Sequence, residues 1–426
     1  MATILIGTVL LSLPIASRTG ESVGFLNALF TATSATCVCG LVVVDTYTQY
    51  SIFGQIVIML LIQIGGLGFM TMATLIFLIL GKRITLRERL VMQEALNQLN
   101  IAGVVKLAKY ILLTTLLFEG IGALLLSLRF VQIYGFSKGV FAGVFHAISA
   151  FNNAGFDLTG DFKSLTPFVE DPLINIVIMV LIIFGGLGFS VIYEVFHVRK
   201  FQRLSLHSKI VLTMTAILLI CGFIGIYAME YNNPKTLGHL SPEGKILAAA
   251  FQSVTSRACG FNTINQADMT MAAKYFTILL MFIGASPGST GGGVKTSTFL
   301  LLLLMVYTII TSKEHVEIFG RRIPWDNVFK ACVIVLMSLS LIFTVSFLLT
   351  LTEKADFIVI LFETVSAFAP VGLSLGITPH LTAAGKVLIM LTMFCGRLGP
   401  LTIALAISTR KKTALIKYPE ERVLVG

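Results

Sequence analysis

Long apolar runs separated by short polar segments follow one another along the whole chain. Many of these runs reach roughly 20 residues, the length that an α-helix needs to cross the hydrocarbon core of a bilayer. Segments in which apolar and polar positions alternate, which would indicate transmembrane β-strands, are few. The pattern therefore predicts a polytopic, all-α membrane protein.

A short motif recurs four times between the apolar runs. It consists of Phe, three residues, Ser or Thr, a short run, Gly, and then Leu or Phe. The glycines are Gly40, Gly155, Gly260 and Gly372, and they lie 105 to 115 residues apart. Soluble solenoid proteins repeat every 20–50 residues, roughly. This longer period therefore indicates a duplicated membrane unit. In the third copy the glycine follows the Ser or Thr by five residues, and in the other copies by six.

Each unit is predicted to contain a spanning helix, a short re-entrant helix that leads into the glycine turn, and a second spanning helix. The fold class is thus four helix–pore-loop–helix repeats around one pore. The short helices are expected at 23–35, 138–150, 243–256 and 357–368. The spanning helices are expected at 2–15, 52–80, 107–128, from about 173 to 198, 210–229, 271–310 (interrupted), 329–351 and 384–408.

These elements divide the chain into four repeats and four connecting or terminal segments. The repeats are 1–80, 107–198, 210–311 and 329–408, the connectors are 81–106, 199–209 and 312–328, and the tail is 409–426. The first apolar run, 2–15, is short. We expect it to be the end of a helix that starts further upstream, with a signal segment as the alternative.

Composition and charge agree with a membrane protein. The chain is 56% hydrophobic and 12% charged, whereas soluble domains carry about 25% charged residues. The net charge of +10 comes from basic residues in the connectors and the tail, which places these segments in the cytoplasm and the glycine turns near the outer surface. This distribution argues against nucleic-acid binding. The six cysteines show neither zinc-finger spacing nor a disulfide framework.

Four irregular turns at membrane depth indicate a cation pathway. Such backbone is tolerated only where it is buried in protein or lines a water-filled cavity. Backbone carbonyls there can replace the hydration shell of an ion, as in potassium channels, and the C-terminal ends of the short helices favour a cation. The predicted filter residues precede and include the glycines: Val38, Cys39, Gly40, Asn153, Ala154, Gly155, Ala258, Cys259, Gly260, Pro370, Val371 and Gly372.

Residues 284–296 interrupt the last apolar segment of the third unit with glycines and Pro287. We expect an intramembrane loop that obstructs the pore below the filter, with a simple helix kink as the alternative. A phosphate-binding P-loop is excluded, since Val294 rather than Gly precedes Lys295. Arg397 lies deep in an apolar helix, where a charge is costly. It is expected to face the pore below the filter and to hydrogen-bond carbonyls of the loop or raise an electrostatic barrier, with snorkelling to the cytoplasmic interface as the alternative. The predicted gate residues are Gly284, Gly288, Thr290, Gly291, Gly292, Gly293, Lys295 and Arg397.

Two further predictions concern supporting residues. The glycines at 65–68, 185–188 and 396–399 are expected to allow close helix packing. The polar residues in the short helices are expected to anchor them behind the filter, with a proton relay as the alternative: Thr31, His146, Gln252 and Glu363.

The fourfold plan, the motif from Thr255 to Thr263 and the glycine-rich break resemble the Ktr/Trk/HKT superfamily of potassium transporters, most closely the membrane subunits of bacterial Ktr systems. The resemblance implies K+ as substrate, held only at the filter carbonyls, with no covalent cofactor, and residues 284–296 as the gating loop. It implies a homodimer in the plasma membrane of a bacterium, regulated by a cytosolic RCK-type nucleotide-binding ring of the KtrA kind. Whether Na+ activates uptake stays open, as does any role of the Cys37 and Cys39 side chains.

Two other function classes, a secondary transporter and an enzyme, agree less well with the sequence. A secondary transporter of a small solute with broken helices predicts inverted repeats, whereas each unit here has an even number of spanning helices and the repeats are parallel. An enzyme needs paired acids, a nucleophile triad or a metal cluster, and the apolar segments show none of these.

Overall fold

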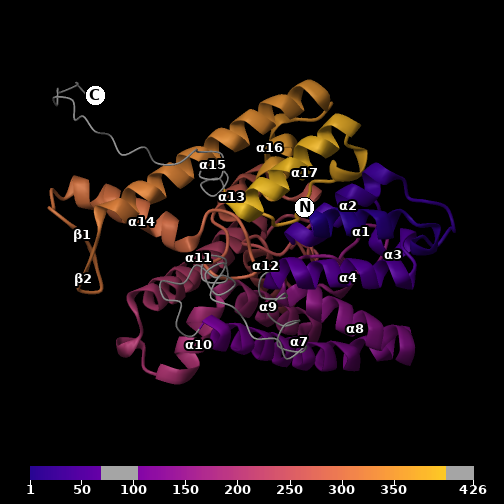
Figure 1. The fold of residues 1–426 in the computed structure, drawn as a ribbon, viewed down its shortest axis with the longest axis horizontal. Helices are drawn as coiled ribbons and strands as arrows, with labels where there is room; N and C mark the ends of the chain where they lie inside the picture. The colour runs from indigo at the N-terminus through magenta and orange to yellow at the C-terminus, as the bar shows by residue number, and fades with distance from the viewer. Residues whose placement is uncertain (69–103, 400–426) are drawn as a thin grey trace.

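The computed structural model describes residues 1–68 and 104–399, which form mostly α-helices (Figure 1). The α-helices are α1 (Ala2–Ser12), α2 (Phe25–Cys37), α3 (Thr46–Gln49), α4 (Ile52–Leu67), α7 (Val104–Tyr134), α8 (Phe136–Phe151), α9 (Pro172–Leu187), α10 (Phe189–Val198), α11 (Leu206–Glu230), α12 (Pro242–Thr255), α13 (Met271–Phe282), α14 (Thr296–Ile310), α15 (Trp325–Thr352), α16 (Phe357–Phe368) and α17 (Ala383–Leu398). Two strands, β1 (Val316–Ile318) and β2 (Arg321–Ile323), pair antiparallel as a hairpin.

Three helices of the described segments, α7, α11 and α15, are long and apolar enough to cross a membrane, and the bent pair α9–α10 makes a fourth candidate span. Large apolar side chains on α7 point outward: Leu113, Leu116 and Leu117 are 58–67% exposed. In water such a surface would be unfavourable, but in a bilayer it faces lipid tails. The protein is therefore a multi-pass membrane protein.

The short helices and the interrupted segment lie close to where the sequence predicts them. α2, α8, α12 and α16 begin and end within two residues of the predicted bounds. The predicted span at 271–310 is broken into α13 and α14, and the stretch between them contains no helix.

The prediction of one unbroken helix after residue 173 is wrong. α9 ends at Leu187, Gly188 adopts φ = 92°, and α10 leaves at an angle of 98° to α9. A positive φ of this kind is readily adopted only by glycine, so Gly188 ends the helix. Gly68 (φ = 80°) and Gly399 (φ = 86°) end α4 and α17 in the same way. The rest of the predicted helices at 52–80 and 384–408 lies outside the described residues.

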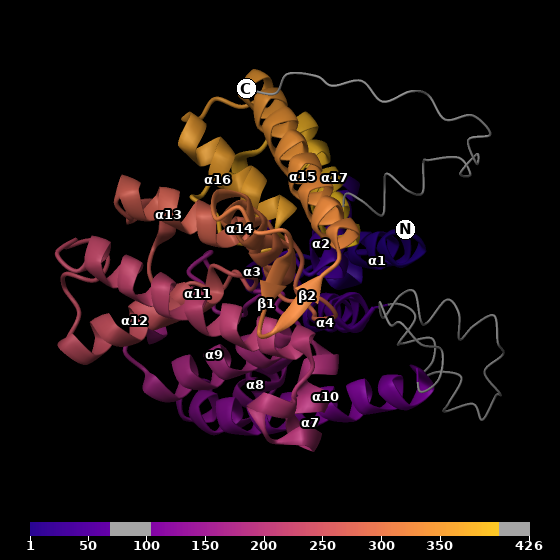
Figure 2. The ribbon, with the colours of Figure 1, turned by 90° about the vertical axis from the view of Figure 1, so that its left-hand side faces the viewer.

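The helices are arranged in chain order around the middle of the molecule (Figure 2). In that view the indigo helices lie on the right, the purple ones below, the magenta ones on the left and the orange and yellow ones above. Helix contacts close the cycle: α4 packs against α8, α9 against α12, α13 against α16, and α17 against α2. The short helix of each predicted repeat therefore packs against the helix that follows the glycine turn of the preceding repeat. The first repeat follows the fourth in this cycle, since α2 packs against α17.

The predicted connectors are partly structured. The segment 199–209 holds a short 3-10 helix at Phe201–Arg203 and the start of α11. The segment 312–328 holds the β1–β2 hairpin, which the sequence analysis did not predict, and α15 begins inside it at Trp325. The connector 81–106 lies outside the described residues except for its last positions in α7, and the tail 409–426 lies outside them entirely.

Candidate functional site

The four glycine turns meet and form a closed ring. Gly40, Gly155, Gly260 and Gly372 all have φ between 68° and 94°. At each of them a β-carbon would overlap the carbonyl oxygen of the residue that precedes the glycine in the next turn. The pairs are Gly40 with Ala154, Gly155 with Cys259, Gly260 with Val371, and Gly372 with Cys39. Both the dihedral angle and the space require glycine at these positions.

One hydrogen bond recurs in all four turns. The residue before each ring glycine donates its backbone N–H to the carbonyl of the motif Ser or Thr. The bonds are Cys39 to Ser34 (2.8 Å), Ala154 to Ser149 (2.7 Å), Cys259 to Thr255 (3.1 Å) and Val371 to Ser366 (2.9 Å). Since the third turn is one residue shorter, its bond spans four residues where the others span five. The shortened spacing therefore leaves the same N–H satisfied.

The side-chain hydroxyls of the motif also hold the turns. Ser34 Oγ accepts from Gly40 N (3.1 Å) and Ser366 Oγ from Gly372 N (3.0 Å). Ser149 and Thr255 donate instead to the carbonyls of Phe156 (2.7 Å) and Phe261 (2.6 Å). The motif phenylalanines have no exposed surface and pack in the core behind the turns: Phe30, Phe145, Phe251 and Phe362. The recurring Phe-x-x-x-Ser/Thr pattern is thus the support of the ring.

The four polar residues of the short helices all bond to the chain that follows the ring glycine, as predicted for anchors. His146 Nε2 accepts from Leu158 N at 3.4 Å. Gln252 and Gln266 exchange side-chain bonds of 2.7 and 2.8 Å. The remaining contacts are Thr31 with Tyr50 Oη at 3.1 Å, and Glu363 with Ser374 Oγ at 2.8 Å and with Thr378 Oγ1.

The predicted filter side chains are buried. Cys39 Sγ lies 3.9 Å from the carbonyl oxygen of Ser366, in the neighbouring short helix. Val38 (φ = 59°) and Asn153 (φ = 60°) adopt the left-handed conformation. A turn with such a residue reverses the chain sharply after a helix, as αL caps do.

The glycine-rich loop, residues 284–296, lies against the turns of three different parts of the chain. Thr290 Oγ1 bonds to Gly185 O (3.0 Å) and Phe151 O (3.3 Å), and lies 3.1 Å from the amide group of Asn153. β-Carbons added at Gly291 and Gly292 would meet Ala258 at 3.0 Å and Pro370 at 2.8 Å. The loop therefore packs directly against the second, third and fourth turns.

Two cationic side chains bind carbonyls of this loop. Lys295 Nζ donates to Gly291 O at 2.6 Å. The guanidinium of Arg397 donates to Thr290 O and also to Gly65 O at the end of α4. The predicted contact between Arg397 and the loop is confirmed, and this one side chain joins α17, the loop and α4.

Of the glycines predicted to allow close packing, the first in each group does so, whereas Gly68, Gly188 and Gly399 end their helices. β-Carbons on Gly65, Gly185 and Gly396 would overlap the carbonyl oxygens of Thr36, Phe151 and Phe368. Each of these carbonyls belongs to one of the last two residues of a short helix. The helices that follow the ring glycines therefore pack against the C-terminal ends of the short helices.

A buried polar cluster next to the second turn was not predicted from the sequence. Glu119, in the middle of α7, is 6% exposed and accepts from Asn152 Nδ2 (2.8 Å) and Gln63 Nε2 (3.1 Å). Asn152 also donates to Gln63 Oε1 at 2.9 Å. A lone carboxyl group inside an apolar segment is the signal that would have revealed it.

A ring of neutral backbone carbonyls is suited to binding a cation that sheds its water, and unsuited to covalent chemistry. No group of three or more His, Cys, Asp or Glu side chains that could hold a metal ion occurs within residues 1–68 and 104–399.

Comparison with known proteins identifies the family. A family model named TrkH, described as a cation transport protein, matches residues 2–416. The chain belongs to the TrkH family of cation transport proteins. Family membership covers nearly the whole sequence and confirms the resemblance inferred from the motifs.

Several relatives align over nearly the whole chain. It is 49% identical over 424 residues to the Ktr system potassium uptake protein B of Bacillus subtilis, covering 100% of this chain and 94% of the relative. It is 44% identical to the protein of the same name from Vibrio alginolyticus (100% and 93% covered). It is 41% identical to the potassium/sodium uptake protein NtpJ of Enterococcus hirae (99% and 94%).

A solved structure shares the fold. The crystal structure of the potassium transporter TrkH from Vibrio parahaemolyticus superposes with a TM-score of 0.74 at 18% identity, covering 95% of this chain and 83% of the other. The likeness extends to the chain as a whole.

Proposed function

We propose that the protein takes up potassium ions across the plasma membrane through the ring of glycine turns, which acts as the selectivity filter. The observation that carries this proposal is the closed cycle in which each ring glycine abuts the carbonyl of the next turn. Four carbonyl-bearing turns around one axis can replace the hydration shell of a cation. Two of the relatives above are named potassium uptake proteins.

The electrostatics of the ring favour a monovalent cation. α2, α8, α12 and α16 all end within a few residues of a ring glycine. Their C-terminal ends carry roughly half a negative charge each, shared over the last carbonyls. Because these groups are partial charges rather than carboxylates, they attract a cation and still allow it to leave.

We propose residues 284–296 as the gate. The loop packs against three of the turns, and Lys295 and Arg397 bind the carbonyls of the adjacent residues Gly291 and Thr290. Two positive charges below the ring oppose the passage of a cation. Opening requires the loop to leave this position and its bonds to Gly185 and Phe151 to break.

Regulation is proposed to come from a cytosolic RCK-type ring, with the membrane protein as a homodimer. These partners are expected from the family resemblance and from relatives that are named as components of a Ktr system. A sodium requirement is suggested by the name of the Enterococcus relative. Uptake measured with and without Na+ tests it.

The deciding experiment looks for the ion itself. The protein is crystallised in rubidium or thallium salts and the anomalous density is mapped. A peak on the axis of the four ring glycines is expected; density elsewhere with an empty ring would overturn the filter assignment.

Flux into proteoliposomes separates this proposal from a small-solute transporter. Radioactive rubidium should enter, and a radioactive amino acid should not. Entry of the amino acid without rubidium would favour the alternative.

A further inference from the structure

A small cavity lies beside the ring, between the third turn and the glycine-rich loop. Its volume is about 20 Å³. Ala258 of the third turn and Ala285 of the loop form part of its wall, together with Ile182 of α9. The polar side chains that line it are Arg257, Thr215 and Asn153.

Among the residues that the structure describes, Arg257 is a buried cation without a counter-charge. It is 8% exposed, and its Nε has no hydrogen-bond partner in that part of the chain. No ion pair of the described residues includes it. An isolated charge taken out of water costs several kcal/mol, so a site of this kind normally contains a compensating group.

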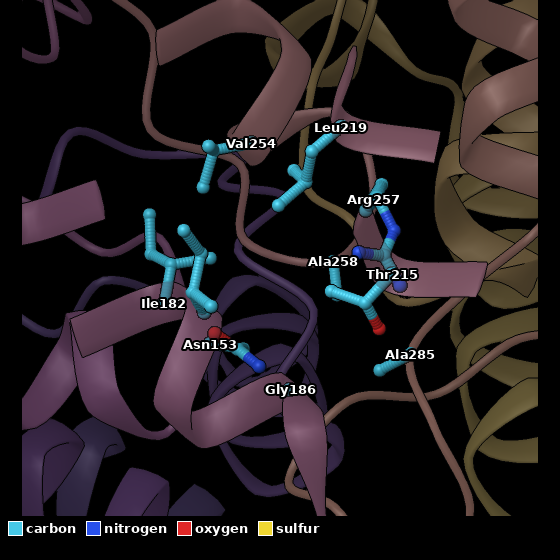
Figure 3. A pocket seen from close by; sticks show the side chains of 10 residues that line it. Asn153, Ile182, Gly186, Thr215, Leu219, Val254, Arg257, Ala258 and Ala285 are labelled. Atoms are coloured by element: carbon cyan, nitrogen blue, oxygen red, sulfur yellow. The ribbon is translucent and has the colours of Figure 1, made fainter. Parts of the chain in front are cut away.

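Thr215 contributes a second unsatisfied group. Thr215 is 7% exposed, and its Oγ1 has no hydrogen-bond partner within residues 1–68 and 104–399. In Figure 3 the Arg257 and Thr215 side chains lie on one side of the cavity and Asn153 on the other. The guanidinium and the hydroxyl can both donate hydrogen bonds, and none of the described residues that line the cavity carries a carboxylate.

We propose that this cavity binds one monatomic anion, chloride under physiological conditions. A water molecule needs at least about 10–15 Å³ of such space, so the cavity admits a single particle of that size and excludes phosphate, sulfate or a carboxylate ligand. Water would satisfy the hydrogen bonds but leave the charge of Arg257 uncompensated. An anion accepts these hydrogen bonds and also compensates the charge of Arg257. The C-terminal end of α12, just before Arg257, supplies partial negative charge only.

The position gives the anion a role in the proposed potassium pathway, and this part of the inference rests on the proposed function. Arg257 lies three residues before Gly260, and the cavity wall includes a residue of the proposed gate. An uncompensated positive charge here weakens cation binding in the ring, and a bound anion restores it.

The binding test uses bromide, which replaces chloride and scatters anomalously. Crystals grown in bromide should show a bromine peak in the cavity, and crystals of Arg257→Gln should not. An empty or water-filled cavity in the bromide crystals, or an equal peak in the variant, overturns the site. Because rubidium density on the ring axis is measured separately, failure of the anion site is distinguishable from failure of the filter.

A solution measurement covers the case in which Arg257→Gln does not fold. Thr215→Val keeps the side-chain shape and removes the hydroxyl. Chloride should raise the melting temperature of the wild type over gluconate at equal ionic strength, with a smaller rise in Thr215→Val, as expected for a ligand that binds the folded state. Equal melting temperatures of the wild type in the two salts would contradict the proposal. Rubidium uptake should fall roughly tenfold in gluconate, a typical coupling between two sites.

Discussion

The guanidinium of Arg397 donates to the backbone carbonyl of Thr290, 107 residues away in the chain. The same side chain reaches Gly65 O, so it bridges the loop and the end of α4. The position of the loop against the ring thus depends on a side chain from the last described helix.

Replacing Arg397 by Gln should increase rubidium flux in the absence of any cytosolic partner, because the loop loses its tie to α4 and one positive charge. Arg397→Lys should give an intermediate increase, since an ammonium group lacks the planar fork that serves two carbonyls. Lys386→Gln is the matched control: it removes the same charge from the same helix, where Lys386 bonds Asn27 Oδ1 at 2.9 Å. Unchanged flux in folded Arg397→Gln would contradict the role in gating.

Substituting a ring glycine should lower the preference for potassium over sodium. In Gly155→Ala or Gly260→Ser the new side chain meets a carbonyl of the next turn, at a φ that strains it. Strain of this kind costs of order 1–3 kcal/mol, so the uptake ratio should fall about tenfold or more. Gly24→Ala is the control. Gly24 also has a positive φ of 88°, but a β-carbon added there would meet no atom within 4 Å. The filter assignment fails if Gly→Ser at all four ring positions leaves the ratio unchanged.

Removing the Ser366 hydroxyl should destabilise the fourth turn. Ser366→Ala removes the hydrogen-bond partner of the half-buried Gly372 N–H, at a cost of about 1 kcal/mol, the usual net contribution of a hydrogen bond. Ser346→Ala provides the comparison, since Ser346 is equally buried and its hydroxyl has no partner. Thermal unfolding in detergent should show a lower melting temperature for the first variant only. Equal shifts in both would mean that the hydrogen bond contributes nothing.

Asp157, in the outer segment after the second turn, should make stability depend on pH. Burial raises the pKa of this carboxyl to about 6 from an ordinary value of 3.8. The folded state therefore binds a proton more tightly than the unfolded chain. This tighter proton binding stabilises the folded state. The stabilisation is complete below about pH 4 and disappears as the pH rises through 6.

Asp157→Asn should remove this dependence, and the measurement is the difference in melting temperature between pH 5 and pH 7.5. The wild type should lose more stability over that interval than the variant. An identical loss in both proteins would show that Asp157 titrates at its ordinary pKa in the folded state.

The ring residues were predictable because they repeat. Phe, Ser or Thr, and Gly recur at nearly fixed spacing, and each recurrence tests the others. The break between α13 and α14 was predictable because consecutive glycines and Pro287 strongly disfavour a regular helix, which left only a kink as the alternative. The bend at Gly188 was not, since a glycine in an apolar helix serves equally well for close packing. Gly185, three residues earlier, has that packing role.

The sequence pattern does not show which groups surround a single buried polar residue. The Glu119 cluster joins α7, α4 and the second turn. The cavity at Arg257 is enclosed by α9, α11, α12, the second and third turns and the glycine-rich loop. Whether such a residue has a partner depends on side chains from distant segments. The sequence can mark Glu119 or Arg257 as unusual, but only packing decides which groups face them.

Because one chain supplies all four turns, the carbonyls of the ring come from four positions that can change independently: Cys39, Ala154, Cys259 and Val371. A channel made of four identical subunits must alter every quarter of its ring with a single substitution. Here a mutation alters one quarter while three hold the axis in place. In the filter proposed above, duplication within one gene would let the ion preference change one quarter of the ring at a time.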